Sequence, residues 1–288
     1  MTQTVHAKKR FGQNFLQDEA ILEQIADAAQ LTKDDAVLEI GPGTGALTMR
    51  LAARAGSVVA VEIDESLRDV LVPALSSAQA ANVTVLFGDI LKTDLGALRK
   101  KYNNGKHFKV VANLPYYIST PVIMKLLRDE VPPASCTVML QKEMAERMSA
   151  SPGGKEYGAL SVAVQYYASP GLICEVPPEA FRPRPKVTSR VIRLLPLDVP
   201  PVTVKNEEFF FRVVEASFAH RRKTLVNSLG ADPVLRLSKE QIADALRKIP
   251  AATKSEDRDG RTDFLPVDIR AERLTIGQFA LLSDFLYN

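Results

Sequence analysis

Short apolar runs alternate with amphipathic stretches through the first two thirds of the chain. The apolar runs predict strands at 36–40, 57–63, 83–87, 108–112 and 135–140, and a later strand at 187–194. Apolar residues at helical spacing predict helices at 20–30, 46–54, 65–75, 120–128 and 143–150. The pattern at 160–167 fits either a strand or a helix. Strands that alternate with helices indicate an α/β fold, in which a parallel sheet is covered on both faces.

The last third of the chain has a different pattern. A proline-rich stretch at 196–201 is typical of a linker, and the helical spacing beyond it predicts helices at 207–229, 239–248 and 276–286. The charged stretch 253–263 lacks apolar anchors and predicts a mobile loop. We therefore expect two domains, a Rossmann-like α/β domain over 1–198 and a small all-helical domain over 199–288.

Composition is ordinary for a soluble protein, with 46% hydrophobic and 25% charged residues. No apolar run approaches the length of a membrane span, and the polar, basic N-terminus lacks the apolar core of a secretory signal. The two cysteines, Cys136 and Cys174, and the three histidines do not have the spacing of a zinc site. We expect a cytoplasmic protein that binds no membrane and no metal.

Local charge is more informative than the net charge of +3, which many soluble enzymes carry. Basic residues gather in three clusters: 8–10, the group Arg182, Arg184, Lys186, Arg190 and Arg193, and 221–223. A single cluster of this kind is most often a solvated surface. Three clusters in a chain that also carries a candidate base-binding motif, residues 113–116 described below, favour RNA as the ligand. Phosphate contacts supply most of the RNA affinity that does not depend on nucleotide sequence.

Residues 41–45 (GPGTG) follow a predicted strand and open a predicted helix. Glycines are needed where the backbone turns sharply and approaches a ligand closely. With Ala46 the segment also satisfies the dinucleotide fingerprint, so it could bind either S-adenosylmethionine or a nicotinamide dinucleotide. Glu62, at the next strand end, could accept hydrogen bonds from the ribose hydroxyls of either cofactor. A glycine turn that only packs the helix on the strand is the simpler alternative.

Two further strand ends discriminate between the cofactors. Asp89 ends the third strand, where a carboxylate can accept a hydrogen bond from an adenine amino group. Residues 113–116 (NLPY) end the fourth strand. A nicotinamide dehydrogenase has no evident use for that tetrapeptide, and the sequence offers no candidate proton donor for hydride chemistry, which makes a dehydrogenase improbable.

The tetrapeptide suits methylation of an adenine amino group, whose lone pair is delocalised into the ring. Carbonyl acceptors can hold a pyramidal amine and stabilise the developing charge. Asn113 offers a side-chain carbonyl, Leu114 a backbone carbonyl, Pro115 a stiff turn, and Tyr116 a stacking face. No strong base is required, because the alkylated amine loses its proton readily. The structural alternative is an Asx turn with a core tyrosine.

Further motifs accompany these residues. They are 11–16 (FGQNFL), 39–45, 61–64 (VEID), 88–89, 113–120 (NLPYYIST), 141–147, 157–162, 181–189 (FRPRPKVTS) and 221–227. Because they occur together from end to end, the chain resembles the KsgA-type small-subunit rRNA dimethyladenosine transferases. The resemblance implies a class I S-adenosylmethionine methyltransferase domain, with no metal.

The resemblance also implies roles for individual residues. The implied S-adenosylmethionine contacts are Asn14, Leu16, Gly41, Glu62, Asp89 and Asn113. The implied contacts of the target adenine are Asn113, Leu114 and Tyr116, with Phe181 a candidate second stacking face. Members of the family transfer four methyl groups to two adjacent adenosines in a hairpin loop near the 3′ end of 16S rRNA, and they act as a late checkpoint in small-subunit assembly.

Two alternatives belong to other classes. Resistance-type methylases of large-subunit rRNA share 13–16 and a similar tetrapeptide, but usually have isoleucine at the position of Leu114 and another residue at that of Tyr117. A non-catalytic assembly factor would not need the cofactor residues. Arg221, Arg222 and Lys223, which we predict to contact phosphates from a helix, fit the assembly-linked family better. The predicted partner is small-subunit rRNA within an immature subunit, bound by a monomer. The stretch 253–263 is longer than is usual in the family.

Overall fold

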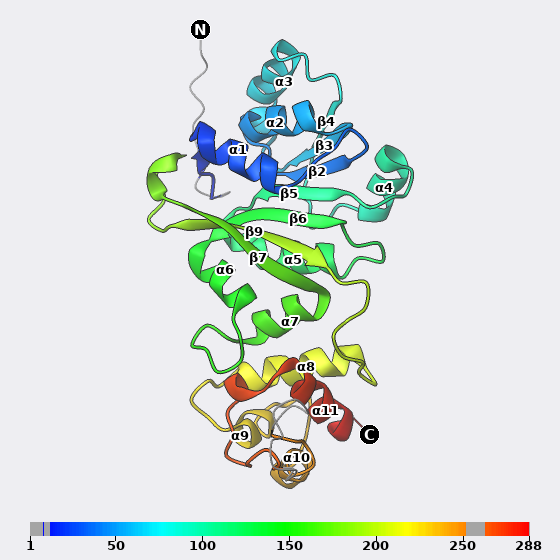
Figure 1. The fold of residues 1–288 in the computed structure, drawn as a ribbon, viewed down its shortest axis with the longest axis vertical. Helices are drawn as coiled ribbons and strands as arrows, with labels where there is room; N and C mark the ends of the chain where they lie inside the picture. Colours follow the sequence, from blue (N-terminus) through cyan, green and yellow to red (C-terminus); the bar gives the residue numbers. More distant parts are fainter. Residues whose placement is uncertain (1–7, 9–11, 252–262, 288) are drawn as a thin grey trace. The chain divides into compact units, whose positions relative to one another are not determined.

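The structure is a computed structural model that describes residues 8, 12–251 and 263–287. By its internal contacts the chain divides into two compact units, shown in Figure 1. The first comprises 1–145 and 168–197, and the second comprises 146–167 and 198–288. The stretch 146–167 thus belongs to the second unit although it precedes three strands of the first. Of the predicted loop 253–263, only Asp263 lies within the described residues.

A seven-stranded sheet forms the centre of the first unit, in the order β4-β3-β2-β5-β6-β9-β7. Its strands are β2 (Ala36–Ile40), β3 (Ser57–Glu62), β4 (Val83–Phe87), β5 (Lys109–Asn113), β6 (Ser135–Gln141), β7 (Ala168–Val176) and β9 (Ser189–Pro196). The fold class predicted from the sequence is confirmed, but the sheet is mixed. Within the described sheet, β9 runs antiparallel to both of its neighbours, β6 and β7, whereas the other pairs of strands are parallel. It follows β7 through a loop without a crossover helix, and such a connection reverses the strand direction.

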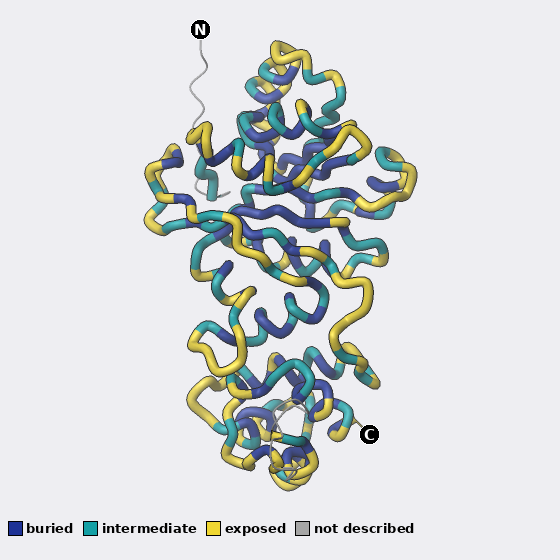
Figure 2. Tube along the Cα trace, viewed as in Figure 1, coloured by how far each residue is buried: buried dark blue, intermediate teal, exposed yellow. Residues whose placement is uncertain are grey.

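Helices cover both faces of this sheet, so that a central strand such as β2 is buried along its whole length (Figure 2). The helices of this unit are α1 (Glu19–Ala28), α2 (Ala46–Arg54), α3 (Arg68–Ser77), α4 (Leu95–Asn103) and α5 (Ser119–Leu127), and α6 (Lys142–Ser149) begins in this unit and ends in the second. Ile25 of α1 and Leu51 of α2 share a core with Val37 of β2. Leu38, the next residue of β2, lies beside Leu95 of α4 and Leu126 of α5. Alternate residues of one strand therefore serve opposite faces.

A two-stranded sheet ties the N-terminal segment to this unit. Here β1 (Phe15–Leu16) pairs antiparallel with β8 (Phe181–Arg182), and Leu16 lies opposite Phe181. The backbone N–H of Gln17 also donates to the Ala180 carbonyl at 2.8 Å. The FGQNFL and FRPRPKVTS segments, far apart in the sequence, are therefore neighbours in the fold.

The second unit is helical, with α7 (Ala159–Tyr167), α8 (Glu207–Phe218), α9 (Leu225–Leu229), α10 (Lys239–Leu246) and α11 (Ile276–Leu286). Its core gathers Tyr157, Phe210, Leu225, Leu274 and Phe279, each no more than 1% exposed. The ambiguous segment 160–167 is helical.

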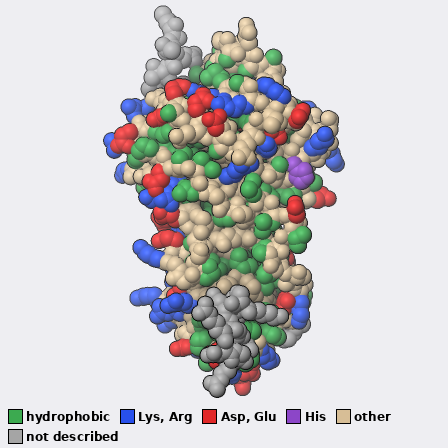
Figure 3. All heavy atoms as spheres, in the orientation of Figure 1, with side chains coloured by type: hydrophobic (Ala, Val, Ile, Leu, Met, Phe, Trp, Pro, Cys, Tyr) green, Lys and Arg blue, Asp and Glu red, His purple; other side chains and the backbone are tan. Residues whose placement is uncertain are grey.

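The prediction of a single helix at 207–229 is wrong. The segment forms two helices, α8 and α9, because the Thr224 side chain accepts a hydrogen bond from the Asn227 N–H and starts a new helix. Arg221, Arg222 and Lys223 therefore lie in the exposed turn between α8 and α9, and not on a helix. Arg221 donates a hydrogen bond to the Lys155 carbonyl of the same unit. Figure 3 shows lysine and arginine side chains over the surface, interspersed with acidic ones.

Two features are absent from the described residues. No helix among them is long and apolar enough to cross a membrane. No group of three or more histidine, cysteine, aspartate or glutamate side chains among them could hold a metal ion.

Candidate cofactor and adenine site

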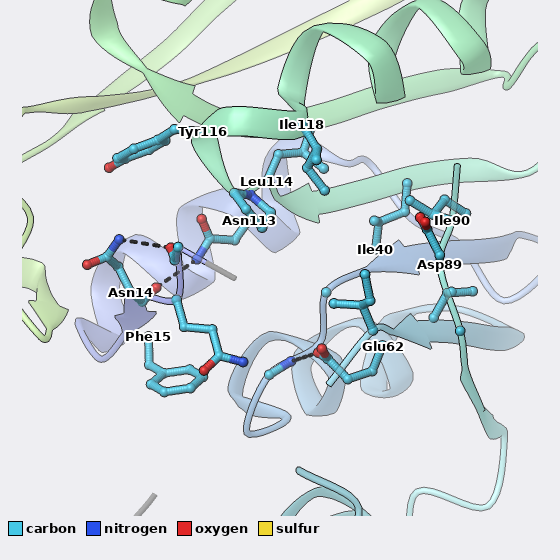
Figure 4. Close-up of a pocket in the computed structure, with 18 of the residues that line it drawn as sticks. Asn14, Phe15, Ile40, Glu62, Asp89, Ile90, Asn113, Leu114, Tyr116 and Ile118 are labelled. Atoms are coloured by element: carbon cyan, nitrogen blue, oxygen red, sulfur yellow. Dashed lines mark hydrogen bonds between the residues drawn. The ribbon is translucent and has the colours of Figure 1, made fainter. Parts of the chain in front are cut away.

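A pocket opens at the carboxyl ends of four neighbouring strands, the position where open α/β sheets bind ligands. Its wall comes from the ends of β2, β3, β4 and β5, from the N-terminal segment 12–15 and from Phe181. Figure 4 shows Glu62 and Asp89 on one side of the pocket and Asn113 and Tyr116 on the other. The polar residues selected from the sequence are therefore brought to one place by the strand order.

The glycine loop after β2 has the backbone that its sequence predicts. Gly41, Gly43 and Gly45 have φ of 72°, 59° and 89°, a left-handed region that favours glycine. A Cβ on Gly43 would lie 3.2 Å from the Phe15 ring, which packs over the loop. Any larger residue would strain the loop and push Phe15 away.

Glu62 holds the glycine loop in place through its side-chain carboxylate. Its carboxylate accepts hydrogen bonds from the Gly43 N–H at 3.0 Å and the Asp64 N–H at 2.8 Å. The side chain is 4% exposed, and burial raises the pKa of Glu62 above its ordinary value. The carboxylate lines the pocket in a fixed orientation, ready to accept hydrogen bonds from hydroxyl groups.

Asp89 follows β4 at the rim of the pocket. One carboxylate oxygen accepts a hydrogen bond from the Leu91 N–H at 2.9 Å. Ile40, Val61 and Ile90 line the pocket together with the two carboxylates. A pocket that combines apolar residues with two carboxylates suits an adenosine, whose base is flat and apolar on its faces and whose edges carry polar groups.

The N-terminal segment is fastened over the pocket by Asp64. Its carboxylate accepts hydrogen bonds from Lys8 Nζ at 2.8 Å and Gln13 Nε2 at 2.9 Å, and from Ser66. Burial alone would raise the pKa of Asp64, but these hydrogen bonds hold it at about 2. A carboxylate that is charged throughout the physiological range therefore anchors the segment that carries Asn14 and Phe15.

The orientation of Asn113 follows from that anchored segment. Asn113 Nδ2 donates to the Asn14 carbonyl at 3.3 Å, and Asn14 Nδ2 donates to the Gly12 carbonyl at 3.1 Å (Figure 4). Because the amide nitrogen of Asn113 is committed to Asn14, its carbonyl oxygen is the end left to accept a hydrogen bond within the site.

The rest of the tetrapeptide is held equally firmly. The Leu114 N–H donates to the Met139 carbonyl at 3.1 Å, and the Ile118 N–H donates to the Pro115 carbonyl at 3.1 Å. Tyr116 begins a 3₁₀ turn, η3 (Tyr116–Ile118), and lines the pocket. Its hydroxyl lies 3.0 Å from the Ser189 hydroxyl. The Leu114 side chain is buried, so only its backbone can serve a ligand.

The remaining predicted residues lie at different distances from this pocket. Leu16 lines an adjoining recess together with Gly41 and Asn113. Phe181 lines the pocket, but its side chain is 1% exposed and belongs to the core, so stacking on it would need that packing to open. Arg221, Arg222 and Lys223 belong to the second unit.

The sequence did not single out Glu39, Gln13 or Ser189. Glu39 lines the recess beside the glycine loop and is 1% exposed. Burial raises the pKa of Glu39 to about 8, and the nearby Glu62 charge adds to the effect. A charged residue inside an apolar strand was the available signal for Glu39, whereas nothing local marked Gln13 or Ser189.

The glycine loop after the first strand of the Rossmann-like sheet, the carboxylates at the next two strand ends and the tetrapeptide 113–116 at a fourth fit an S-adenosylmethionine-dependent methyltransferase. The family model described as Ribosomal RNA adenine dimethylase matches residues 4–252. The chain belongs to the ribosomal RNA adenine dimethylase family.

Individual relatives agree with this assignment. A protein of Lachnoclostridium phytofermentans named Ribosomal RNA small subunit methyltransferase A is 49% identical over 279 residues, which is 97% of this chain and 91% of the relative. The crystal structure of a dimethyladenosine transferase from Plasmodium falciparum has a TM-score of 0.72 and 27% identity, covering 93% of this chain and 95% of that one. The 23S rRNA methyltransferase ErmE has a TM-score of 0.64 and 26% identity, covering 96% and 100%. The resemblance and the fold class inferred from the sequence are confirmed.

Proposed function

We propose that this protein dimethylates the 6-amino groups of two adjacent adenosines in a hairpin loop near the 3′ end of small-subunit rRNA, with S-adenosylmethionine as methyl donor. Family membership supports the reaction, and the name of the relative from Lachnoclostridium phytofermentans supports the small subunit. The observation that carries the proposal is the Asn113 amide, whose nitrogen is committed to Asn14 while its oxygen stays available beside Tyr116 and the cofactor residues.

The residues present fit the cofactor. Glu62 and Asp89 would bind the ribose hydroxyls and the adenine amino group, with Ile40 and Ile90 against the base. The left-handed glycines leave room beside Phe15 that a Cβ would fill. Asn14, Leu16, Gly41 and Asn113 would border the methionine half. When bound, S-adenosylmethionine supplies an electrophilic methyl group on its sulfonium.

The chain's own residues would prepare the target amine. Tyr116 stacks the extruded adenine, a contact of about 1–3 kcal/mol. The Asn113 side-chain carbonyl and the Leu114 backbone carbonyl accept hydrogen bonds from the amino group and keep the nitrogen pyramidal. The amine held by these residues would take up the methyl group that the bound sulfonium supplies, and it would then lose one proton to solvent. A second turnover on the same nitrogen gives the dimethylated product.

Binding of the subunit would depend on other groups. Arg221, Arg222 and Lys223 are exposed cations in one turn, suited to phosphate oxygens. We propose that the Rossmann-like domain, residues 1–198, carries out methyl transfer and that the helical domain, residues 199–288, binds the RNA. The protein would act as a monomer in the cytoplasm, on an immature subunit that it helps to check late in assembly.

A methyl-transfer assay with labelled S-adenosylmethionine tests this function. Immature small subunits and naked large-subunit rRNA are offered in parallel, and the products are digested to nucleosides. We expect N6,N6-dimethyladenosine in the small-subunit RNA and none with Asn113→Ala at matched times. Label in the large-subunit RNA alone would indicate a resistance-type methylase. Subunit binding without any transfer would indicate a non-catalytic assembly factor.

A further inference from the structure

Ser189 lies beside the site and has no role in the mechanism above. It is the first residue of β9, where it pairs with Gln141 of β6 and Val176 of β7. Its side chain is 1% exposed, and its hydroxyl lies 3.0 Å from the hydroxyl of Tyr116. The two residues are 73 positions apart, so only the folded sheet brings them together.

This contact bears on the aromatic side chain of the tetrapeptide. Tyr116 sits on a short 3₁₀ turn, where the backbone fixes the Cα but leaves the two side-chain torsions to their surroundings. A hydrogen bond at the tip of the ring restricts both torsions at once. Ser189 is a rigid anchor for that bond because its strand is paired on both sides.

We propose that Ser189 is a positioning residue for methyl transfer. Its hydroxyl holds the Tyr116 ring in the plane on which the target adenine stacks, opposite the cofactor residues. The inference rests on the proposed function, since it requires an adenine in the pocket. Ser189 is not among the described residues that line the pocket, so it acts through Tyr116 and not on the ligands.

A purely structural role makes a different prediction. A buried hydroxyl needs a hydrogen-bond partner, and Tyr116 could simply satisfy Ser189. In that case removing the serine hydroxyl would change stability and leave the saturated transfer rate unaltered. If Ser189 positions the ring, its removal slows transfer, and the slowing depends on the tyrosine hydroxyl.

A double-mutant cycle separates the two roles. Single-turnover transfer to immature small subunits, at saturating cofactor and subunit, is measured for wild type, Ser189→Ala, Tyr116→Phe and the double variant. We expect each single substitution to slow transfer about threefold to tenfold, the effect of one neutral hydrogen bond. The double variant should be no slower than Tyr116→Phe alone, because both changes remove the same bond.

Matched measurements complete the test. Ser135→Ala removes another buried serine hydroxyl at the start of a strand, and it should keep the wild-type rate. The affinity of Ser189→Ala for S-adenosylmethionine should equal that of wild type. Ser189→Cys preserves the packing and weakens the hydrogen bond, so it should transfer at an intermediate rate even if the alanine variant does not fold.

Two outcomes would overturn the assignment of Ser189: a Ser189 variant that folds and transfers at the wild-type rate, or a double variant slowed by the product of the two single effects. Failure of the proposed function would look different, because wild-type protein itself would then form no dimethyladenosine on small subunits.

Discussion

The two units of this protein hold their functional groups in opposite ways. In the first unit Glu62, Asp89 and Asn113 follow strands, and each is fixed by hydrogen bonds to backbone groups. In the second unit Arg221, Arg222 and Lys223 lie exposed in a turn between two helices. Chemistry needs fixed positions, whereas phosphate binding tolerates mobile cations. Substitutions in the first unit should therefore change the rate or the cofactor affinity, and those in the second should change the RNA affinity.

Asn113→Ala should have the largest effect. It removes an acceptor aimed at the charge that develops on the amine, and loss of one such group costs about a hundredfold to a thousandfold in rate. The measurement is single-turnover transfer at saturating cofactor and subunit, with S-adenosylmethionine affinity determined separately by calorimetry. Asn103→Ala, which removes an amide at the end of α4, is the matched control and should keep the full rate. Equal rates for the two variants would remove Asn113 from the chemistry.

Tyr116→Ala should slow transfer about tenfold to a hundredfold, because the stacking face is lost. Tyr116→Phe keeps that face and loses only the bond to Ser189, so it should slow transfer by only about threefold to tenfold, the effect of one neutral hydrogen bond. If Tyr116→Phe is as slow as Tyr116→Ala, the hydroxyl has a chemical role and stacking is not the explanation. If both variants transfer at the full rate, the tetrapeptide is not the catalytic site.

Glu62→Ala should weaken S-adenosylmethionine binding about tenfold or more, the effect of losing hydrogen bonds to a charged acceptor. Burial raises the pKa of Glu62, so the carboxyl takes up a proton at a higher pH than an ordinary glutamate does. Cofactor affinity should therefore begin to fall, as the pH is lowered, above the usual glutamate range. The control is Glu65→Ala, an exposed neighbour paired with Arg68, which should bind the cofactor normally.

Neutralising Arg221, Arg222 or Lys223 should weaken subunit binding a few-fold for each residue and flatten its salt dependence by up to about one unit per lost contact. S-adenosylmethionine affinity should not change. Binding titrations over a range of salt concentrations measure both quantities. Arg247→Gln, which changes an exposed arginine directly after α10 that pairs with Asp244, serves as the control in the same unit. An unaltered salt slope would identify the triplet as a solvated surface.

Glu39→Gln should have the smallest effect, on stability alone. With a pKa of about 8 in the fold, Glu39 keeps a proton that the unfolded chain releases at lower pH. Stability should therefore fall as the pH rises from about 5 to about 8, and glutamine should abolish this loss. Thermal unfolding without cofactor should show Glu39→Gln above wild type near pH 8 and much closer to it near pH 5. A constant difference would mean that Glu39 does not titrate in this range.

Periodicity predicted most of the fold because the first unit buries strands on both faces. The bounds expected for β2, β4, α2 and α11 agree with the structure, and those of β3 and β5 shift by one residue. Two of the longer elements that the sequence analysis did not predict were missed for a physical reason. Helix α4 buries only three residues, and β7 is an edge strand with Leu172 and Ile173 exposed, so neither shows a clear apolar period.

Some features of the site could be predicted from the sequence and others could not. Residues at strand ends could be selected from the sequence, because parallel strands bring their carboxyl ends to one edge. The contacts of Asp64 with Lys8 and Gln13, and of Tyr116 with Ser189, join residues at least 51 positions apart. No local pattern encodes such pairs. The break before Thr224 was missed because the apolar spacing continues through the turn, and it moved the basic triplet off the helix.

The central claim is that the first unit performs the chemistry and the second binds the subunit. It is tested most directly by one measurement, single-turnover methyl transfer to immature small subunits as the cofactor and subunit concentrations are raised to saturation. Asn113→Ala should remain at least about a hundredfold slow at saturation, because its defect lies in the transfer step. The variant that neutralises Arg221, Arg222 and Lys223 together should reach the wild-type rate. A full saturated rate for Asn113→Ala, or a slow one for the triple variant, would contradict the account.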